Sequence, residues 1–520
     1  MHQTLLIDEI FELILDSCIG THTLAQVAQT CQAWKDPTLN RLWWRLSSFK
    51  PLLNLIPGLT LVNGAYVTVQ ALESPLCPDF RRLQHYASRV KQVVYQEKIC
   101  LHPTLIFLFY QHCETAPLFQ KLVTVQLSMT NSSSLGPIVS LAKSLMKVDL
   151  NLGYKKDTST TSNSSAFDFL SNVNRVSSSF QSLSLRGIAT NQLMHLVSNL
   201  THLEVLRLRV STTLSVETLA AVSTFPHLKE LEIHISHILP KDVTFSPLVC
   251  FPSLQSLNIR GRTDSISKLL HHMQSESLAV LRIDLQSPIY IDNAWTELFA
   301  ALKEKTHTSL LRLTIEHHMD TLETSLETNT PSSLDTPTTS LPHINNVSQT
   351  NPNDIFCFEH LRSLSNHRSL RQIVFETTPP ILIHDSNLEQ IVQWWPNLEH
   401  LDLGSLSTND PRWTPKVTPV GLSTLSRGLS TLDTLVIPVN VTGLTSDAAI
   451  KLTQNPNNRL RFLTVTGLMP PDQYTAPCLH RLFPSLITVH GGPDHEEAWD
   501  GVQTNLESLN LSEKCIGHAK

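Results

Sequence analysis

The sequence predicts an α/β solenoid preceded by a small three-helix domain. An apolar pattern, Leu-x-x-Leu-x-Leu or a close variant, recurs along most of the 520 residues. Between its copies lie segments with the apolar spacing of helices, several of which begin beside a capping residue. The first fifty residues instead show the apolar spacing of three short helices. Regular repetition of strand and helix favours an extended array over a single compact core.

The composition excludes several classes of protein. Hydrophobic residues make up 41% and charged residues 16%, which is typical of folded elements that are covered on most sides. The formal net charge of -6 is spread thinly, and no basic run is long enough to follow nucleic-acid phosphates. The most apolar stretch, TLIFLFY at 104–110, has the length of a core strand and is too short for a membrane span. We therefore expect no nucleic-acid partner and no membrane.

The cysteines and the N-terminus bear on the cellular compartment. The nine cysteines are dispersed and form no C-x-x-C pair, which favours reduced thiols over a disulfide framework. The first residues, MHQTLLIDEIFEL, lack a basic start, and three acidic residues interrupt their apolar run. This is not the pattern of a signal peptide. We expect a cytoplasmic or nuclear protein.

Three short helices are predicted in the first fifty residues. Residues 5–18 place Ile10, Leu13 and Ile14 on one helical stripe, which further apolar residues widen. The second helix has apolar residues spaced i, i+3, i+4, i+7, at positions 24, 27, 28 and 31. The third is predicted to begin at Asp36-Pro37, because Asp is a good N-cap and Pro is tolerated at the first helical position.

Three of the eight tryptophans fall in this domain, at positions 34, 43 and 44. A core of three short helices is too small to hold all three centrally, because so short a chain buries little of its own surface. At least one face of the domain should therefore dock on the following domain or on a partner.

These fifty residues resemble an F-box, and their sequence is similar to those of fungal F-box proteins. The family's opening, Leu-Pro-x-Glu-Ile with a further apolar residue on the same helix, is matched by Leu6, Glu9, Ile10 and Leu13. Its middle, which ends in Val-Cys-x-x-Trp, is matched by Val27, Cys31 and Trp34, and its Leu-Trp end by Leu42-Trp43. One departure is Ile7-Asp8, which stands where the family has Pro.

The resemblance implies that the helices bind the small adaptor protein of cullin–RING ubiquitin ligases, and through it the cullin. The adaptor-binding residues that it implies are Leu6, Ile7, Glu9, Ile10, Leu13, Val27, Trp34, Leu42 and Trp43.

The remaining chain repeats the apolar pattern at steps of 25, 26 and 24 residues, from copies that begin at positions 203, 228, 254 and 278. Later copies begin at 310, 370, 398, 432, 460 and 486, and weaker upstream copies at 180, 145, 122 and 90. Helical patterns follow capping residues at 216–222, 266–273 and 388–395. Strand, loop and helix at this period are typical of leucine-rich repeats, here irregular because the usual Asn is mostly missing.

We therefore predict a leucine-rich-repeat horseshoe over residues 90–492, after an F-box-like domain at 1–50 and a connector at 51–89, with a C-terminal tail at 493–520. Residues 158–165 and 320–353 are rich in Ser and Thr without apolar period, and both are predicted to be mobile loops. The alternative fold, a doubly wound α/β domain, predicts a glycine-rich phosphate turn, and the sequence contains none.

No sequence motif indicates catalysis. The chain has no G-x-S-x-G, H-E-x-x-H or kinase signature, and the His271-His272 and His317-His318 pairs have no Cys or carboxylate at ligand spacing. We expect no catalytic residue, metal or cofactor.

In a solenoid, residues that alternate with the buried leucines point outward from the strands. Those of four adjacent repeats form a strip of mixed charge suited to a protein partner: Arg207, Arg209, Glu232, His234, Arg260, Arg282 and Asp284. The sequence thus favours a substrate-recognition subunit of a ubiquitin ligase, whose repeats hold an unknown target protein. The alternative is an interaction scaffold unrelated to ubiquitin, in which the first helices only cap the solenoid.

Overall fold

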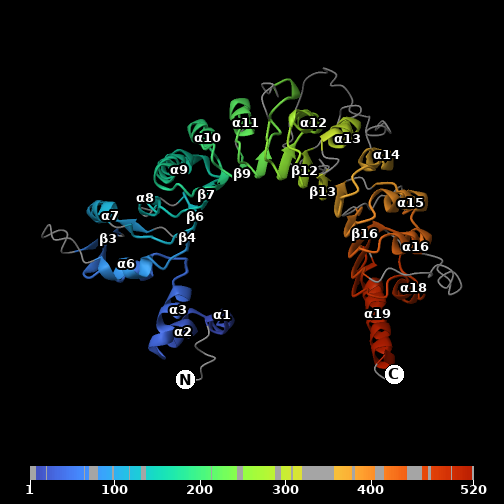
Figure 1. Cartoon of the computed structure of the whole chain (residues 1–520), viewed down its shortest axis with the longest axis horizontal. Coiled ribbons are helices and arrows are strands. Elements are labelled where there is room, and N and C mark those ends of the chain that lie inside the picture. The colour runs from blue at the N-terminus through green and yellow to red at the C-terminus, as the bar shows by residue number, and fades with distance from the viewer. Residues whose placement is uncertain are drawn as a thin grey trace, which may run out of the picture. The chain divides into compact units, whose positions relative to one another are not determined.

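The computed structural model describes residues 8–18, 20–63, 65–68, 80–95, 99–115, 117–130, 136–211, 214–242, 250–286, 294–305, 309–318, 356–377, 381–404, 415–441, 459–466, 470–492 and 495–517. The chain divides into two compact units, unit 1 (Met1–His234) and unit 2 (Ile235–Lys520). Each contains parallel strands whose connections carry helices (Figure 1).

Unit 1 begins with three helices, α1 (Asp8–Ser17), α2 (Thr21–Val27) and α3 (Gln32–Leu42). Phe11, Leu15 and Leu24 form their core, and the ring of Trp34 stacks on that of Phe11 with centroids 5.0 Å apart. The expected start of the third helix at Asp36-Pro37 is wrong, because α3 begins at Gln32 and contains Pro37. Because α3 begins at Gln32, Trp34 lies on the helix and packs against Phe11. Pro37 has no backbone N–H, so the helix lacks one hydrogen-bond donor at that position.

Parallel strands in sequence order make up the sheet of unit 1: β1 (Arg45–Leu46), β4 (Gln92–Tyr95), β6 (Thr124–Ser128), β7 (Lys147–Gly153), β8 (Ser182–Gly187), β9 (Val205–Val210) and β10 (Glu230–His234). Equivalent apolar positions lie side by side, as Leu183, Leu206 and Leu231 do on β8, β9 and β10. Because β1 pairs with β4, the end of the segment 1–50 belongs to this sheet.

The connections of unit 1 carry α4 (Lys50–Leu53), α6 (Arg81–Ala87), α7 (Pro103–Thr115), α8 (Gly136–Val139), α9 (Lys156–Val176), α10 (Asn191–Ser198) and α11 (Val216–Ser223). A small sheet of β2 (Leu59–Val62), β3 (Ala65–Thr68) and β5 (Cys100–Leu101) lies within the predicted connector and just after it.

One local expectation in unit 1 is wrong: residues 158–165 are part of the 21-residue helix α9 and not a loop. The apolar stretch 104–110, which has the length of a core strand, is part of the helix α7. In α9, Ala166, Phe169 and Val173 are buried on one side of the helix. Packing of this apolar side outweighs the weak helix propensity of the Ser and Thr residues before it.

Unit 2 has the same construction. Its parallel strands are, in sequence order, β11 (Ser256–Gly261), β12 (Val280–Gln286), β13 (Arg312–His318), β14 (Gln372–Thr377), β15 (His400–Asp402), β16 (Thr434–Pro438), β17 (Phe462–Thr466) and β18 (Thr488–His490). Its helices are η2 (Pro240–Asp242), α12 (Thr263–His272), α13 (Ala294–Lys305), α14 (Phe358–Leu361), η4 (Arg362–Leu364), α15 (Asp385–Trp394), α16 (Pro419–Gly428), α18 (Thr475–Leu482) and α19 (Glu496–Gly517).

Helix α19 occupies most of the segment expected as a C-terminal tail. It buries Trp499, Val502 and Leu506, and the side chain of Gln503 accepts a hydrogen bond from the backbone N–H of Val489 on β18. The helix therefore covers the last strand of the array.

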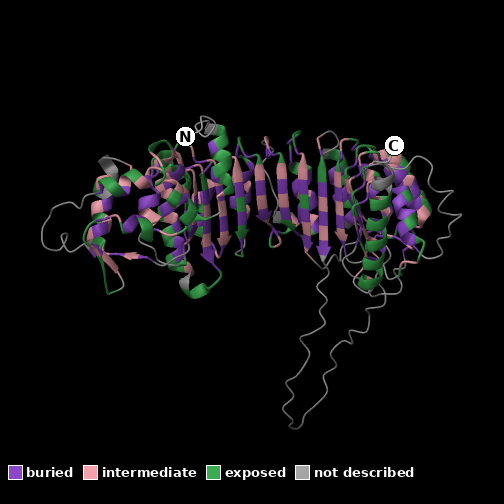
Figure 2. Ribbon diagram, turned by 90° about the horizontal axis from the view of Figure 1, so that it is seen from below, coloured by how far each residue is buried: buried purple, intermediate pink, exposed green. Residues whose placement is uncertain are grey.

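The α/β solenoid is confirmed by the parallel strands in sequence order and by the burial of the repeated apolar residues. The residues that open the four most regular copies, Leu203, Leu228, Leu254 and Leu278, are at most 1% exposed. Along most strands of the two large parallel arrays, buried residues alternate with half-buried or exposed ones, as the banding in Figure 2 shows. This alternation defines an open face of each unit's strands, opposite the buried leucines.

The predicted loop 320–353 and the residues Leu6 and Ile7 lie outside the described residues. Within the described ranges, no helix is both long and apolar enough to cross a membrane.

Candidate protein-interaction surfaces

Helix α1 exposes an apolar face. Leu13 is 67% exposed, Ile10 37% and Ile14 36%, whereas Phe11 and Leu15 fill the core of the three helices. Among the predicted adaptor-binding residues, Glu9, Ile10 and Leu13 thus lie on the outside of α1. Three large apolar side chains on one exposed helix face are typical of a surface that binds another protein.

The other predicted adaptor-binding residues have partners inside the chain. Val27, Trp34 and Leu42 are half-buried and pack against the core of the three helices. The ring of Trp43 lies 5.0 Å from that of Tyr86 on α6, so it contributes to the joint between the three helices and the array. Only α1 therefore presents a group of these residues together to solvent among the residues that the structure describes.

The three tryptophans take three different positions. Trp34 belongs to the helical core and Trp43 to the joint, whereas Trp44 is 40% exposed and lies beneath the guanidinium of Arg41. The same arginine forms an ion pair with Asp16 on α1. Trp44 also extends the sheet, because its carbonyl oxygen accepts from the backbone N–H groups of residues 91 and 92.

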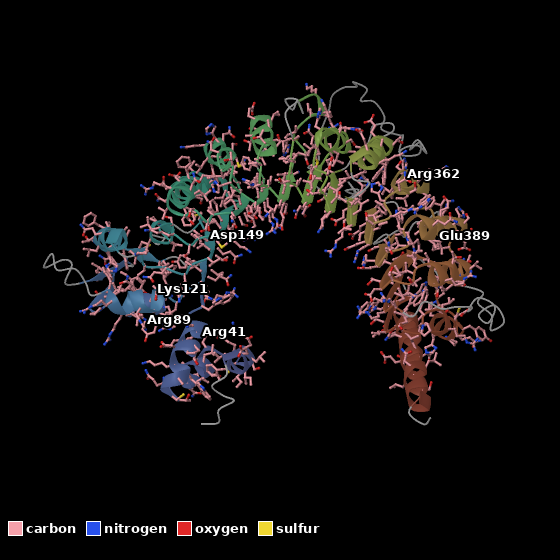
Figure 3. The ribbon with its side chains drawn as sticks, in the orientation of Figure 1. Arg41, Arg89, Lys121, Asp149, Arg362 and Glu389 are labelled. Carbon is pink, nitrogen blue, oxygen red and sulfur yellow. The ribbon has the colours of Figure 1, made fainter. Side chains whose placement is uncertain are left out.

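Arg89 ties α3 to the array (Figure 3). Its guanidinium donates to the side chain of Asp36 at 2.7 Å and to Asn40 Oδ1 at 2.6 Å, and the side chain is only 11% exposed. The hydrogen bonds of Arg89 to Asp36 and Asn40 and the Trp43–Tyr86 contact both hold the helical domain at the first strands of unit 1.

The predicted target face of unit 1 is a set of ion pairs between neighbouring strands. Arg207 donates to Glu230 at 2.9 Å, and Arg209 donates to both carboxylate oxygens of Glu232, at 2.6 and 3.0 Å. The hydrogen bond to Glu232 raises the pKa of Arg209. The pairs are diagonal, because the Cα register places Glu232 beside Arg207. His234 is half-buried at the end of β10.

Unit 2 carries the rest of the predicted face. Arg260 lies 3.4 Å from Asp284, its register neighbour, and Arg282 forms a 2.7 Å ion pair with Glu316 on β13. The predicted residues therefore fall in two units, and most of their charges are satisfied by each other. A face of paired charges offers fewer free groups to a target than the sequence suggests.

Among the described residues on the open face of unit 2, Asp402 has the carboxyl group whose pKa is most shifted. Burial raises its pKa to about 6; the backbone N–H of Gly404, which donates to it at 3.0 Å, lowers the pKa, and Glu376 raises it. Burial also lowers the pKa of His400 on the same strand. Among the described residues, no three side chains of the metal-binding types are grouped to hold an ion.

Sequence reasoning passed over the weaker copies that begin at positions 122, 145 and 180. Their outward residues include Gln126, Asp149, Asn151 and Arg186, which lie together on the open face of unit 1 and line a polar cavity. The alternation of buried and outward positions also marks these residues in the sequence, although the apolar pattern of these copies is less regular.

Two of the solved structures that resemble this chain show the range of the likeness. One is a chain in the crystal structure of the Rad7 and Elc1 complex from yeast, 13% identical over 94% of this chain and 92% of that chain, with a TM-score of 0.36. The other is the leucine-rich repeat-containing protein LegL7 from Legionella pneumophila, 12% identical over 69% of this chain and 97% of that chain, with a TM-score of 0.30. No family model and no curated protein matches the sequence. The fold assignment therefore rests on the strand order and burial in this chain itself.

Proposed function

We propose that this protein is the substrate-recognition subunit of a cullin–RING ubiquitin ligase of the F-box type. The exposed apolar face of α1 carries the proposal. The three-helix domain already has a core in Phe11, Leu15 and Leu24, so Ile10, Leu13 and Ile14 are not needed for its folding. Such a face is stabilised when a partner covers it, and the F-box resemblance supports the ligase adaptor as that partner.

In this proposal the chain does no chemistry. The three helices bind the adaptor, which brings the cullin, and the repeats hold a target protein near the ubiquitin-conjugating enzyme. The gain is a higher effective concentration of the target at that enzyme. The clamp of Arg89 on Asp36 and Asn40 supports this role, because a fixed joint between the two binding parts limits the positions that the target can take.

A second function, a scaffold unrelated to ubiquitin, is favoured by one observation. Strand β1 pairs with β4, so the helices lead directly into the first strand of the sheet and act as its cap. Capping accounts for Trp43 and Arg89. It gives no role to the exposed face of α1, which is why we prefer the first function.

Binding of purified adaptor to the full-length chain tests the proposal. Leu13→Asp should abolish binding without unfolding the domain, because the side chain is 67% exposed. Phe107→Asp on α7 is the matched control, since Phe107 is 60% exposed on the array, and this variant should bind like the wild type. If the wild-type chain does not bind the adaptor, the ligase function is wrong and the capping scaffold stands.

A further inference from the structure

Two adjoining cavities lie in unit 1. The first, with a volume of about 340 Å³, is on the open face, and polar side chains of β6, β7 and β8 line most of it. The second, of about 390 Å³, shares Tyr95, Leu127 and Ser128 with the first and continues to α8 and α9. There Pro137 and Phe169 provide apolar lining. Together they form a polar site beside a more apolar one.

The amide side chains in the first cavity are held by one end only. Gln126 Nε2 donates to Asp149 Oδ2 at 3.1 Å, and Asn151 Oδ1 accepts from the backbone N–H of Gly153 at 3.1 Å. Within the described residues, neither the other end of Gln126, its Oε1, nor the NH₂ group of Asn151 makes a hydrogen bond. The cavity therefore offers an acceptor and a donor pair whose orientation is already fixed.

Arg186 adds further donors. Its Nε lies 3.7 Å from Asp149 Oδ1, which is longer than a hydrogen bond, and its side chain is 41% exposed. By contrast, Arg209 on the next strand uses both Nε and Nη2 on Glu232. The Nη groups of Arg186 have no hydrogen-bond partner among the described residues and are available to a ligand. Figure 3 labels Asp149 on the same open face.

Beside the cavity, the backbones of Gly153 and Gly187 lie very close to each other. Gly153 and Gly187 have φ angles of +78° and +112°, a region that side chains rarely adopt. A Cβ at Gly187 would lie 2.3 Å from the carbonyl oxygen of Gly153. This approach fixes the ends of β7 and β8, and with them Asn151 and Arg186, so little order is lost when a ligand binds.

The charges of the site favour a neutral ligand. Asp149 and Arg186 cancel each other, and Asp168, which lines the second cavity, adds one negative charge. A carboxylate or phosphate in the polar cavity would therefore meet Asp149 there and lie beside the negative charge of the adjoining cavity. A carboxamide has both a carbonyl oxygen for Arg186 and Asn151 and an NH₂ group for Gln126 Oε1.

We propose that the paired cavities bind a short segment of the target protein, with an Asn or Gln side chain in the polar cavity and a neighbouring apolar side chain in the other. This deepens the proposed function and rests on it, because it moves target capture from the paired charges of β9, β10, β11 and β12 to β4, β6, β7 and β8. The polar cavity recognises a side-chain amide and excludes an acidic residue at the target position that enters it.

Fluorescence polarisation of labelled peptides on the full-length chain tests the proposal. The probes are Gly/Ser peptides that carry Leu-Gln, Leu-Asn, Leu-Glu, Leu-Lys or Leu-Ala at the centre. The two amide peptides should bind about 5–10-fold more tightly than the other three, as expected for one or two lost hydrogen bonds. Equal binding of Leu-Gln and Leu-Ala, a preference for Leu-Glu, or no binding of any peptide would each overturn the proposal.

Two variants locate the site. Asn151→Asp keeps the acceptor for Gly153 and removes the free donors, and Arg186→Gln removes the guanidinium; each should weaken the Leu-Gln peptide about 5-fold. Arg282→Gln, on the face of unit 2, is the control and should bind like the wild type. If Arg282→Gln weakens the peptide and the other two do not, the site is elsewhere. Adaptor binding is measured in parallel, because its failure alone disproves the ligase function while leaving the peptide result valid.

Discussion

Exchanging the charges of the Arg209–Glu232 pair tests whether cross-strand ion pairs hold the open face of unit 1. The guanidinium donates to both carboxylate oxygens, at 2.6 and 3.0 Å, and Arg209 is about half exposed, with a side-chain exposure of 54%. Arg209→Gln should therefore lower the free energy of unfolding by about 0.5–1 kcal/mol. Arg209→Glu should lower it by about 1–2 kcal/mol, because it also sets two carboxylates side by side.

The double exchange, Arg209→Glu with Glu232→Arg, restores opposite charges. Its free energy of unfolding should therefore lie within about 0.5 kcal/mol of that of the wild type. The free energies of the wild type, Arg209→Glu, Glu232→Arg and the double variant are measured by hydrogen exchange of β9 and β10, because a repeat array need not unfold in one step. The coupling energy should shrink in 1 M salt, where the screening length is about 3 Å. Single-variant effects that simply add in the double variant, at low and high salt alike, would refute the reasoning.

Other variants test the core, a carboxyl group and the joint. Leu206→Ala, at a fully buried position, should lower the free energy of unfolding of unit 1 by about 2–5 kcal/mol in a denaturant titration; a loss below about 1 kcal/mol would contradict the repeat assignment. The folded-state pKa of Asp402 is raised to about 6, so the wild type should lose stability as the pH rises from about 4 to 6. Asp402→Asn has no such loss, so its free energy of unfolding should exceed that of the wild type by about 1–3 kcal/mol at pH 7. A difference that does not depend on pH would argue against the raised pKa. Arg89→Ala should speed hydrogen exchange in α1–α3 while leaving β9 protected, and unchanged exchange would show that Trp43 alone holds the joint.

The buried positions of this fold could be predicted from the sequence more fully than its other features. Positions such as Leu206, Leu231 and Leu257 repeat at nearly constant steps, and each lies beside its counterpart on the neighbouring strand, fully or almost fully buried. A one-residue slip would turn every leucine outward, so the apolar pattern alone determines the register.

Helix α9 was not predicted because its first residues are rich in Ser and Thr, which have weak helix propensity. The residues Ala166, Phe169, Leu170 and Val173 follow at i, i+3, i+4 and i+7, and all four are buried. A helix pattern that begins late in a polar segment was present in the sequence. The connection between parallel strands β7 and β8 also needs a crossover element to cover the sheet.

The pairing of charges could not be predicted from the repeat alignment. Alignment of Leu206 with Leu231 places Arg207 beside Glu232, as the Cα register confirms. The long side chains instead reach diagonally, from Arg207 to Glu230 and from Arg209 to Glu232. Side-chain reach across a parallel pair depends on the twist and stagger of the strands, which the sequence does not specify.

Affinity purification of the tagged full-length protein from cells, followed by mass spectrometry, tests the ligase function most directly. The matched comparison is a chain that lacks residues 1–43, which leaves β1 and its pairing with β4 in place. The full-length protein should bring down the adaptor, the cullin and a target, and the shortened chain should bring down the target alone. Recovery of a target by the full-length protein without adaptor or cullin would contradict the ligase function and leave the capping scaffold.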